Sequence, residues 1–170
     1  PEEIFYGLRG LPGAEEMLPA CEFEGDVPVF VSVDVPGPKR MGDGAELHAR
    51  AGKTIAIDHH LPLEPFAGTA YIDPDAAASA LIVWDLLPLL GVEHDERMAT
   101  CCFAGLSSDT GSFCYQNTTE EVFQDASRMV QAGANPADIA HDLYQNRSDT
   151  SLQLEARMVE RMKFFCDGQA

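Results

Sequence analysis

Residues 55–60 read Ile-Ala-Ile-Asp-His-His, an alternating apolar run that ends in three consecutive residues able to bind metals and carry protons. Residues 29–34 read Val-Phe-Val-Ser-Val-Asp, a second apolar run that also ends in an acid. β-branched residues dominate both runs, which is typical of strands. The nearly continuous apolar character of residues 27–34 predicts a strand buried on both faces.

The segment between these two runs predicts a β-α-β unit. Residues 45–51 suit a short helix that Gly52 ends, and residues 53–58 form the next strand. Such a unit pairs its strands in parallel through a right-handed crossover. The carboxyl ends of both strands therefore lie at one edge of the sheet, where ligands gather in open α/β folds.

The rest of the chain is mainly helical. A short strand is expected around residues 71–72, and Thr118-Thr119-Glu120-Glu121 matches a capping box, with Gly133 as the stop of that helix. Helices are expected over residues 76–90, 95–106, 118–132, 137–146 and 152–165. Strands alternating with helices, followed by a helical second half, predict an α/β fold with a doubly wound, mainly parallel sheet flanked by helices.

Composition restricts the classes of partner. The chain has 170 residues, enough for one compact domain or most of one, and its net charge is −17. An acidic chain offers no basic stripe for a nucleic-acid backbone, so a phosphate ester would have to be bound through cations. Five cysteines without regular spacing argue against a disulfide framework and for the cytoplasm. No apolar run approaches the roughly 18 residues of a membrane span, so no membrane partner is expected.

Candidate site residues follow the predicted strands. Asp34 stands at one strand end, and Asp58, His59 and His60 stand at the next. A further acid, Asp109, is expected in a Gly-flanked turn. Carboxylate and neutral imidazole suit Mn²⁺, Mg²⁺, Co²⁺ or Zn²⁺. Adjacent histidines leave a strand end on opposite sides, so one can hold a metal while the other turns to the substrate, and the preceding acid can orient a ring.

The combination of these segments resembles the DHH phosphoesterase family. Within the family, the chain is most similar to the short-oligonucleotide phosphodiesterases that also remove the 3′-phosphate of phosphoadenosine phosphate. The resemblance rests on residues 11–15, 31–34, 57–60, 72–74 with Ser79, 105–113 and 133–135.

The resemblance implies a two-metal hydrolase, usually manganese-dependent, in which the ions stabilise the attacking and leaving oxygens of an in-line displacement at phosphorus. Mg²⁺ or Co²⁺ would also suit the ligands. Carried over to this sequence, Asp34 and Asp109 would bridge the two ions and His59 would bind one of them. His60 would hold the phosphate or assist the leaving group, and Asp58 would lie behind the histidines.

The chain also departs from the family pattern. Nothing before Leu11 matches the His and Asp cluster that supplies the remaining ligands in the family, and the C-terminal substrate-binding domain is not seen. Leu81 stands where the resemblance implies a Glu. We therefore expect residues 1–170 to be part of a DHH domain, with weak metal affinity and activity when tested alone.

Three functions remain open at this point. The first is a metal-dependent phosphoesterase that acts on short oligonucleotides or nucleoside 3′,5′-bisphosphates. The second is a pyrophosphatase or polyphosphatase with the same metal centre. The third is a degenerate, non-catalytic module for nucleotide binding or dimerisation. A nucleotide or short oligonucleotide is the expected partner in the first case, and a homodimer is compatible with all three.

Overall fold

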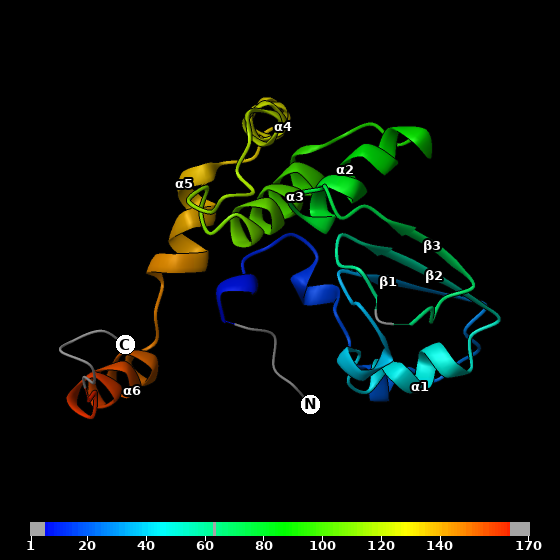
Figure 1. Ribbon diagram of the computed structural model, residues 1–170, viewed down its shortest axis with the longest axis horizontal. Coiled ribbons are helices and arrows are strands. Elements are labelled where there is room, and N and C mark those ends of the chain that lie inside the picture. The colour runs from blue at the N-terminus through cyan, green and yellow to red at the C-terminus, as the bar shows by residue number, and fades with distance from the viewer. Residues whose placement is uncertain (1–5, 63, 164–170) are drawn as a thin grey trace.

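The computed structural model describes residues 6–62 and 64–163 and has a three-stranded parallel sheet in the order β1-β2-β3 (Figure 1). The strands are β1 (Val29–Val33), β2 (Lys53–Asp58) and β3 (Thr69–Ile72). Val33 pairs with Ile57, and Asp58 pairs with Ile72. The strands thus end together at one edge of the sheet, as the β-α-β pattern predicted, and the α/β fold class is confirmed.

Helices surround the sheet and continue beyond it. They are α1 (Gly44–Ala49), α2 (Ser79–Leu89), α3 (Glu96–Asp109), α4 (Glu120–Gln131), α5 (Pro136–Ala140) and α6 (Asp149–Glu160). Figure 1 shows α1 on one side of the sheet, with α2 and α3 side by side on the other and α4 and α5 beyond them. Short 3-10 turns occupy Tyr6–Leu8, Ala14–Glu16, Ala20–Glu22 and Pro38–Arg40. A π-helical turn, His141–Gln145, follows α5.

The main hydrophobic core lies among the helices rather than under the sheet. Its larger members are Trp84 of α2, Phe103 and Leu106 of α3, and Met129 of α4. At the start of α3, the Asp95 carboxylate accepts a hydrogen bond from the Met98 amide at 2.8 Å, which satisfies a free donor of the first turn. Because α3 runs through this core, its last residue, Asp109, is held in a fixed place.

The prediction that β1 is buried on both faces was wrong. Val29, Val31 and Val33 are 46%, 49% and 41% exposed, and they share one face of the strand. The opposite face carries Phe30, whose ring meets the His48 ring of α1 edge-on at 5.5 Å. Within the described residues, β1 is an edge strand with a helix over one face alone, so its apolar run does not mean two-sided burial.

Helix α2 begins later than the sequence pattern predicted. Three alanines precede Ser79, and alanine favours helix, so the helix was expected from residue 76. Ala78 is instead extended, with φ −158° and ψ 146°. The later start of α2 matters because Ala76 and Ser79 contact the candidate site, as described below.

Helix α3 is longer than expected and changes the setting of Asp109. This residue is the last of a helix and not part of a Gly-flanked turn. Gly105 lies inside the helix, and a side chain there is disfavoured because a Cβ would come within 2.8 Å of the Ala80 Cβ of α2. After Thr110 the backbone turns left-handed, with φ of 56°, 57° and 63° at Gly111, Ser112 and Phe113.

Three other boundaries also differ from the predictions. Thr119 precedes α4 without forming the expected side-chain cap. Helix α5 ends at Ala140 and passes into the π-helical turn. Helix α6 begins at Asp149, where Ser148 caps it, and the last two residues of the predicted helix fall outside the described residues. Across residues 6–62 and 64–163, no helix is both long and apolar enough to cross a membrane.

Candidate metal centre

Four of the predicted site residues meet at the carboxyl ends of β1 and β2. Asp34 follows β1, Asp58 ends β2, and His59 and His60 come next along the chain. One ligand atom from each of these residues lies within 4.8 Å of the other three. The parallel register of the two strands explains this meeting, since it places residue 34 beside residue 58.

His59 is held in a single tautomer. Its Nδ1 atom lies 3.0 Å from the carbonyl oxygen of Ala76, which can only accept a hydrogen bond, so Nδ1 carries the proton. Nε2 then lies 3.5 Å from Oδ1 of Asp34 and 3.7 Å from Oδ2 of Asp109. With Nδ1 directed at this carbonyl, Nε2 faces two carboxylates, an arrangement that a cation bound between them would stabilise.

Asp58 is buried behind the two histidines, and it orients His60. Oδ1 of Asp58 accepts hydrogen bonds from the amide and from Nδ1 of His60, both at 2.8 Å. This leaves Nε2 of His60 available to a ligand, on a side chain that is half exposed. Oδ2 of Asp58 is buried and has no hydrogen-bond partner in the structure. An unpaired buried carboxylate oxygen is costly, so this atom also favours a bound cation.

Asp34 adopts a backbone conformation that is uncommon for residues other than glycine. Its φ is 59°, in the left-handed region, which asparagine and aspartate tolerate better than most residues. The Asp34 amide donates to the carbonyl of Ile57 at 3.0 Å, and the Ser79 hydroxyl donates to its Oδ1 at 2.9 Å. Strained residues of this kind gather at functional sites.

Asp109 reaches the same centre from the end of α3. Burial raises the pKa of its carboxyl group, and the charge of Asp34 raises it further, while His59 and His60 lower it. The main-chain carbonyl of Asp109 accepts a hydrogen bond from the side-chain amide of Asn117 at 3.1 Å. Sequence reasoning assigned no role at the site to Asn117. The only indication in the sequence was that Asn117 closely follows Tyr115, where a turn was expected.

The donor set fits a divalent cation. Carboxylate oxygens and imidazole nitrogens converge in this cluster, Oδ2 of Asp58 has no hydrogen-bond partner among the described residues, and Nε2 of His59 faces carboxylate oxygens of Asp34 and Asp109. The cluster can therefore bind a metal ion. Oxygen and nitrogen ligands suit Mn²⁺, Mg²⁺ and Co²⁺ alike, so the donors do not identify the metal.

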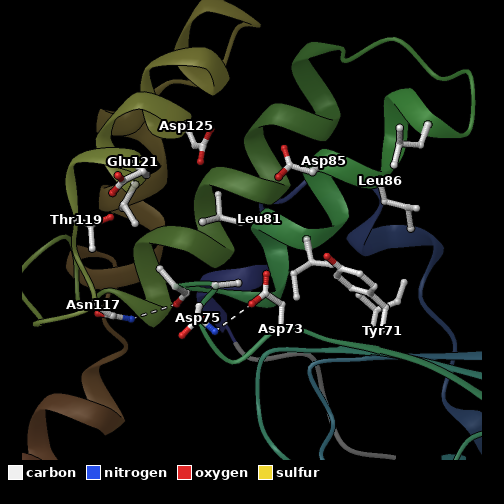
Figure 2. Close-up of a pocket in the computed structure, with 16 residues that line it drawn as sticks. Tyr71, Asp73, Asp75, Leu81, Asp85, Leu86, Asn117, Thr119, Glu121 and Asp125 are labelled. Carbon is white, nitrogen blue, oxygen red and sulfur yellow. Dashed lines mark hydrogen bonds between the residues drawn. The ribbon is translucent and has the colours of Figure 1, made fainter.

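A cavity of about 480 Å³ lies between β3, α2 and the start of α4 (Figure 2). Leucines and Tyr71 line it, and five acids stand around it: Asp73, Asp75, Asp85, Glu121 and Asp125. A smaller cavity of about 290 Å³ borders Asp34 and Asp109 themselves. Within the part of the chain that the structure describes, the larger cavity is lined by no His or Cys, so the candidate metal ligands lie in the Asp and His cluster.

Several known proteins are similar to this chain in sequence. No family model matches the chain. The bifunctional oligoribonuclease and PAP phosphatase NrnA of Thermus thermophilus is 33% identical over 162 residues, which are 95% of this chain and 48% of the relative. The protein of the same name from Bacillus subtilis is 26% identical over 123 residues, 70% of this chain and 38% of that protein.

A solved structure shows the same fold. The crystal structure of an exopolyphosphatase-related protein from Bacteroides fragilis matches with a TM-score of 0.81 and 25% identity, over 97% of this chain and 50% of that one. The chain thus spans about half the length of the relatives that it matches. Over that half, the resemblance to the DHH phosphoesterases of the oligoribonuclease and PAP phosphatase type is confirmed.

Proposed function

We propose that this chain carries the metal centre of a phosphoesterase that hydrolyses short oligonucleotides or nucleoside 3′,5′-bisphosphates. The observation that carries the proposal is Nε2 of His59, which lies between the carboxylates of Asp34 and Asp109 in a fixed tautomer. The names of the similar proteins support the class of substrate. They describe those proteins, and the assignment to this chain is ours.

In this proposal, Asp34, His59 and Asp109 hold divalent ions, with Mn²⁺ as the first candidate. Such ions, when bound, neutralise phosphate charge and activate water for attack at phosphorus. The chain is acidic overall and has 11 lysines and arginines against 28 acids. A cation is therefore needed before a phosphate ester can approach these carboxylates.

His60 has a separate role in the proposal. Asp58 accepts a hydrogen bond from its Nδ1–H, which fixes the ring plane and leaves Nε2 to contact a phosphate oxygen or to assist the leaving group. Asp58 is buried, so it acts through the imidazole and does not reach the substrate. The two adjacent histidines thus differ in role, because their Nδ1–H groups donate hydrogen bonds to different acceptors.

A turnover assay tests the proposal. Dinucleotides and phosphoadenosine phosphate are incubated with Mn²⁺ and either the wild-type protein, His60→Ala or Asp34→Asn. We expect His60→Ala to lower kcat by roughly 10²–10⁴-fold, the usual contribution of a positioned acid or base. His141→Ala is the matched control, because His141 is an exposed histidine far along the chain that pairs with Asp142.

Two results would count against the proposal. Unchanged turnover in His60→Ala would remove this residue from the site. Absence of both metal binding and turnover in the wild-type protein would favour a non-catalytic nucleotide-binding or dimerisation module.

A second candidate is hydrolysis of pyrophosphate or polyphosphate at the same centre. The similarity to an exopolyphosphatase-related protein favours it. Tripolyphosphate and pyrophosphate belong in the same assay, and faster turnover of these compounds than of dinucleotides would select this alternative.

A further inference from the structure

We propose that Ser79 is a positioning residue of this centre, whose hydroxyl fixes Asp34 and His59 relative to each other. The inference rests on the proposed function, since it concerns ligands of the same metal centre. Ser79 is the first residue of α2, and its exposed fraction is 2%. It is therefore a buried polar group that needs partners, and all of its partners belong to the candidate site.

The hydroxyl of Ser79 connects three segments. It accepts a hydrogen bond from the His59 amide at 3.1 Å and donates to Oδ1 of Asp34 at 2.9 Å. Oδ1 of Asp58 lies farther away, at 3.4 Å. A hydroxyl has a single proton, which goes to the nearer carboxylate, while its lone pairs remain free for the amide. Ser79 thus links the residue after β1 to the residue after β2.

Residues 76–79, which lead into α2 and include its first residue, hold His59 at two points. Ser79 binds its main-chain amide, and the carbonyl of Ala76 accepts the Nδ1 proton of its ring. Ala78, between these two residues, is extended. Both the position and the tautomer of this imidazole are therefore set by residues 76–79.

Asp34 needs such a contact more than the other ligands do. Its side chain is 46% exposed and its backbone is left-handed, so neither packing nor a favoured conformation fixes its carboxylate. The bond from Ser79 fixes one carboxylate oxygen. Groups that orient metal ligands typically contribute a factor of about 10–100 to metal affinity.

Isothermal titration with Mn²⁺ tests this role in the intact protein. We expect Ser79→Ala to raise the dissociation constant about 10–100-fold, whereas Ser79→Thr, which keeps the hydroxyl, stays within about threefold of wild type. Ser32→Ala is the matched control, because Ser32 is also buried and its hydroxyl donates to the Ile55 carbonyl at 3.3 Å. Equal Mn²⁺ affinity in Ser79→Ala and wild type would overturn the inference.

Hydrogen exchange in the metal-free protein gives a second readout. The His59 amide should exchange at least about tenfold faster in Ser79→Ala, with the amides of β2 unchanged, because one local bond is lost. An unchanged His59 amide would also overturn the inference. If Ser79→Ala does not fold, Ser79→Cys serves in both experiments, since a thiol is a weak donor of similar size.

These readouts separate the two proposals. A wild-type protein that binds Mn²⁺ but hydrolyses no phosphate ester contradicts the proposed function and leaves the role of Ser79 intact. A wild-type protein that hydrolyses these esters, together with a Ser79→Ala variant of equal metal affinity, contradicts the role of Ser79 alone.

Discussion

At the scale of the residue, hydrogen-bond partners decide what otherwise identical side chains can do. His59 and His60 are neighbours whose rings meet edge-on at 4.3 Å. The Nδ1–H group of His59 donates a hydrogen bond to a main-chain carbonyl, and that of His60 donates one to a buried carboxylate. The first ring thereby faces two acids, and the second keeps a free nitrogen on an exposed side chain.

Asp125, in the wall of the larger cavity, gives a prediction about pH. Burial raises its pKa above the ordinary 3.8, and the nearby charge of Asp85 raises it further, although Arg128 lowers it. The folded state therefore binds this proton more tightly than the unfolded state. The resulting stability is present below pH 3.8 and is lost as the pH rises through the folded pKa.

Removal of the Asp85 charge should reduce the stability that the fold loses when Asp125 ionises. We expect Asp85→Asn to raise the free energy of unfolding at pH 7 by about 0.2–0.5 kcal/mol, because these acids are partly exposed and screened. The gain should shrink toward pH 3.5, as measured by urea denaturation. Glu24→Gln is the control, since Glu24 is an exposed acid outside the cavity. An equal gain from that change would mean that relief of the overall negative charge explains the effect.

At the scale of the element, the position of α3 depends on how closely it approaches α2. Gly105 faces Ala80 at a distance that leaves no room for another carbon. The close approach carries α3 to its end at Asp109, beside His59. A shift between the two helices would therefore separate a ligand from the site.

A substitution at Gly105 tests this packing. Alanine favours helix over glycine by about 1 kcal/mol, yet overpacking costs about 1–3 kcal/mol. We expect Gly105→Ala to lower the free energy of unfolding by about 1–2 kcal/mol and to weaken Mn²⁺ binding. In α1, a Cβ at Gly44 would meet no atom closer than 3.8 Å, so Gly44→Ala should not destabilise. Greater stability in Gly105→Ala would show that the helices separate freely.

Element boundaries show what the sequence could predict. β2 was predicted to the residue, because an apolar run and the charged residues around it define it. The start of α2 was missed, since the propensity of three alanines cannot show that the Ala76 carbonyl is engaged by His59. Both strand-end groups followed from local pattern. Ser79 entered only through the family resemblance, without a role, and Asn117 was given no role at the site, because their hydrogen bonds to Asp34 and Ala77 join segments distant in sequence.

At the scale of the whole molecule, like charges concentrate at the place where the strands end. A net charge of −17 opposes compaction, and the carboxylates of Asp34, Asp58 and Asp109 add to it locally. Bound cations would relieve that repulsion and join β1, β2 and α3. The proposed metal is thus expected to stabilise the fold as well as to serve the reaction.

Thermal unfolding measures this coupling. Mn²⁺ at about 100 times its dissociation constant should stabilise the folded protein by about 2.7 kcal/mol, and EDTA should reverse the increase in Tm. Asp109→Asn should lose most of the Mn²⁺-dependent increase and, without metal, should be at least as stable as wild type, because one repulsive charge is gone. The same increase in Asp109→Asn would exclude Asp109 as a ligand.

The left-handed backbone of Asp34 affects how mutational scans of this protein should be interpreted. An alanine at φ 59° carries a conformational cost of roughly 1–2 kcal/mol that asparagine and glycine largely escape. An alanine scan would therefore record misfolding and loss of chemistry as a single defect at position 34. Asparagine keeps the shape and the turn while it removes the charge, so it is the informative replacement.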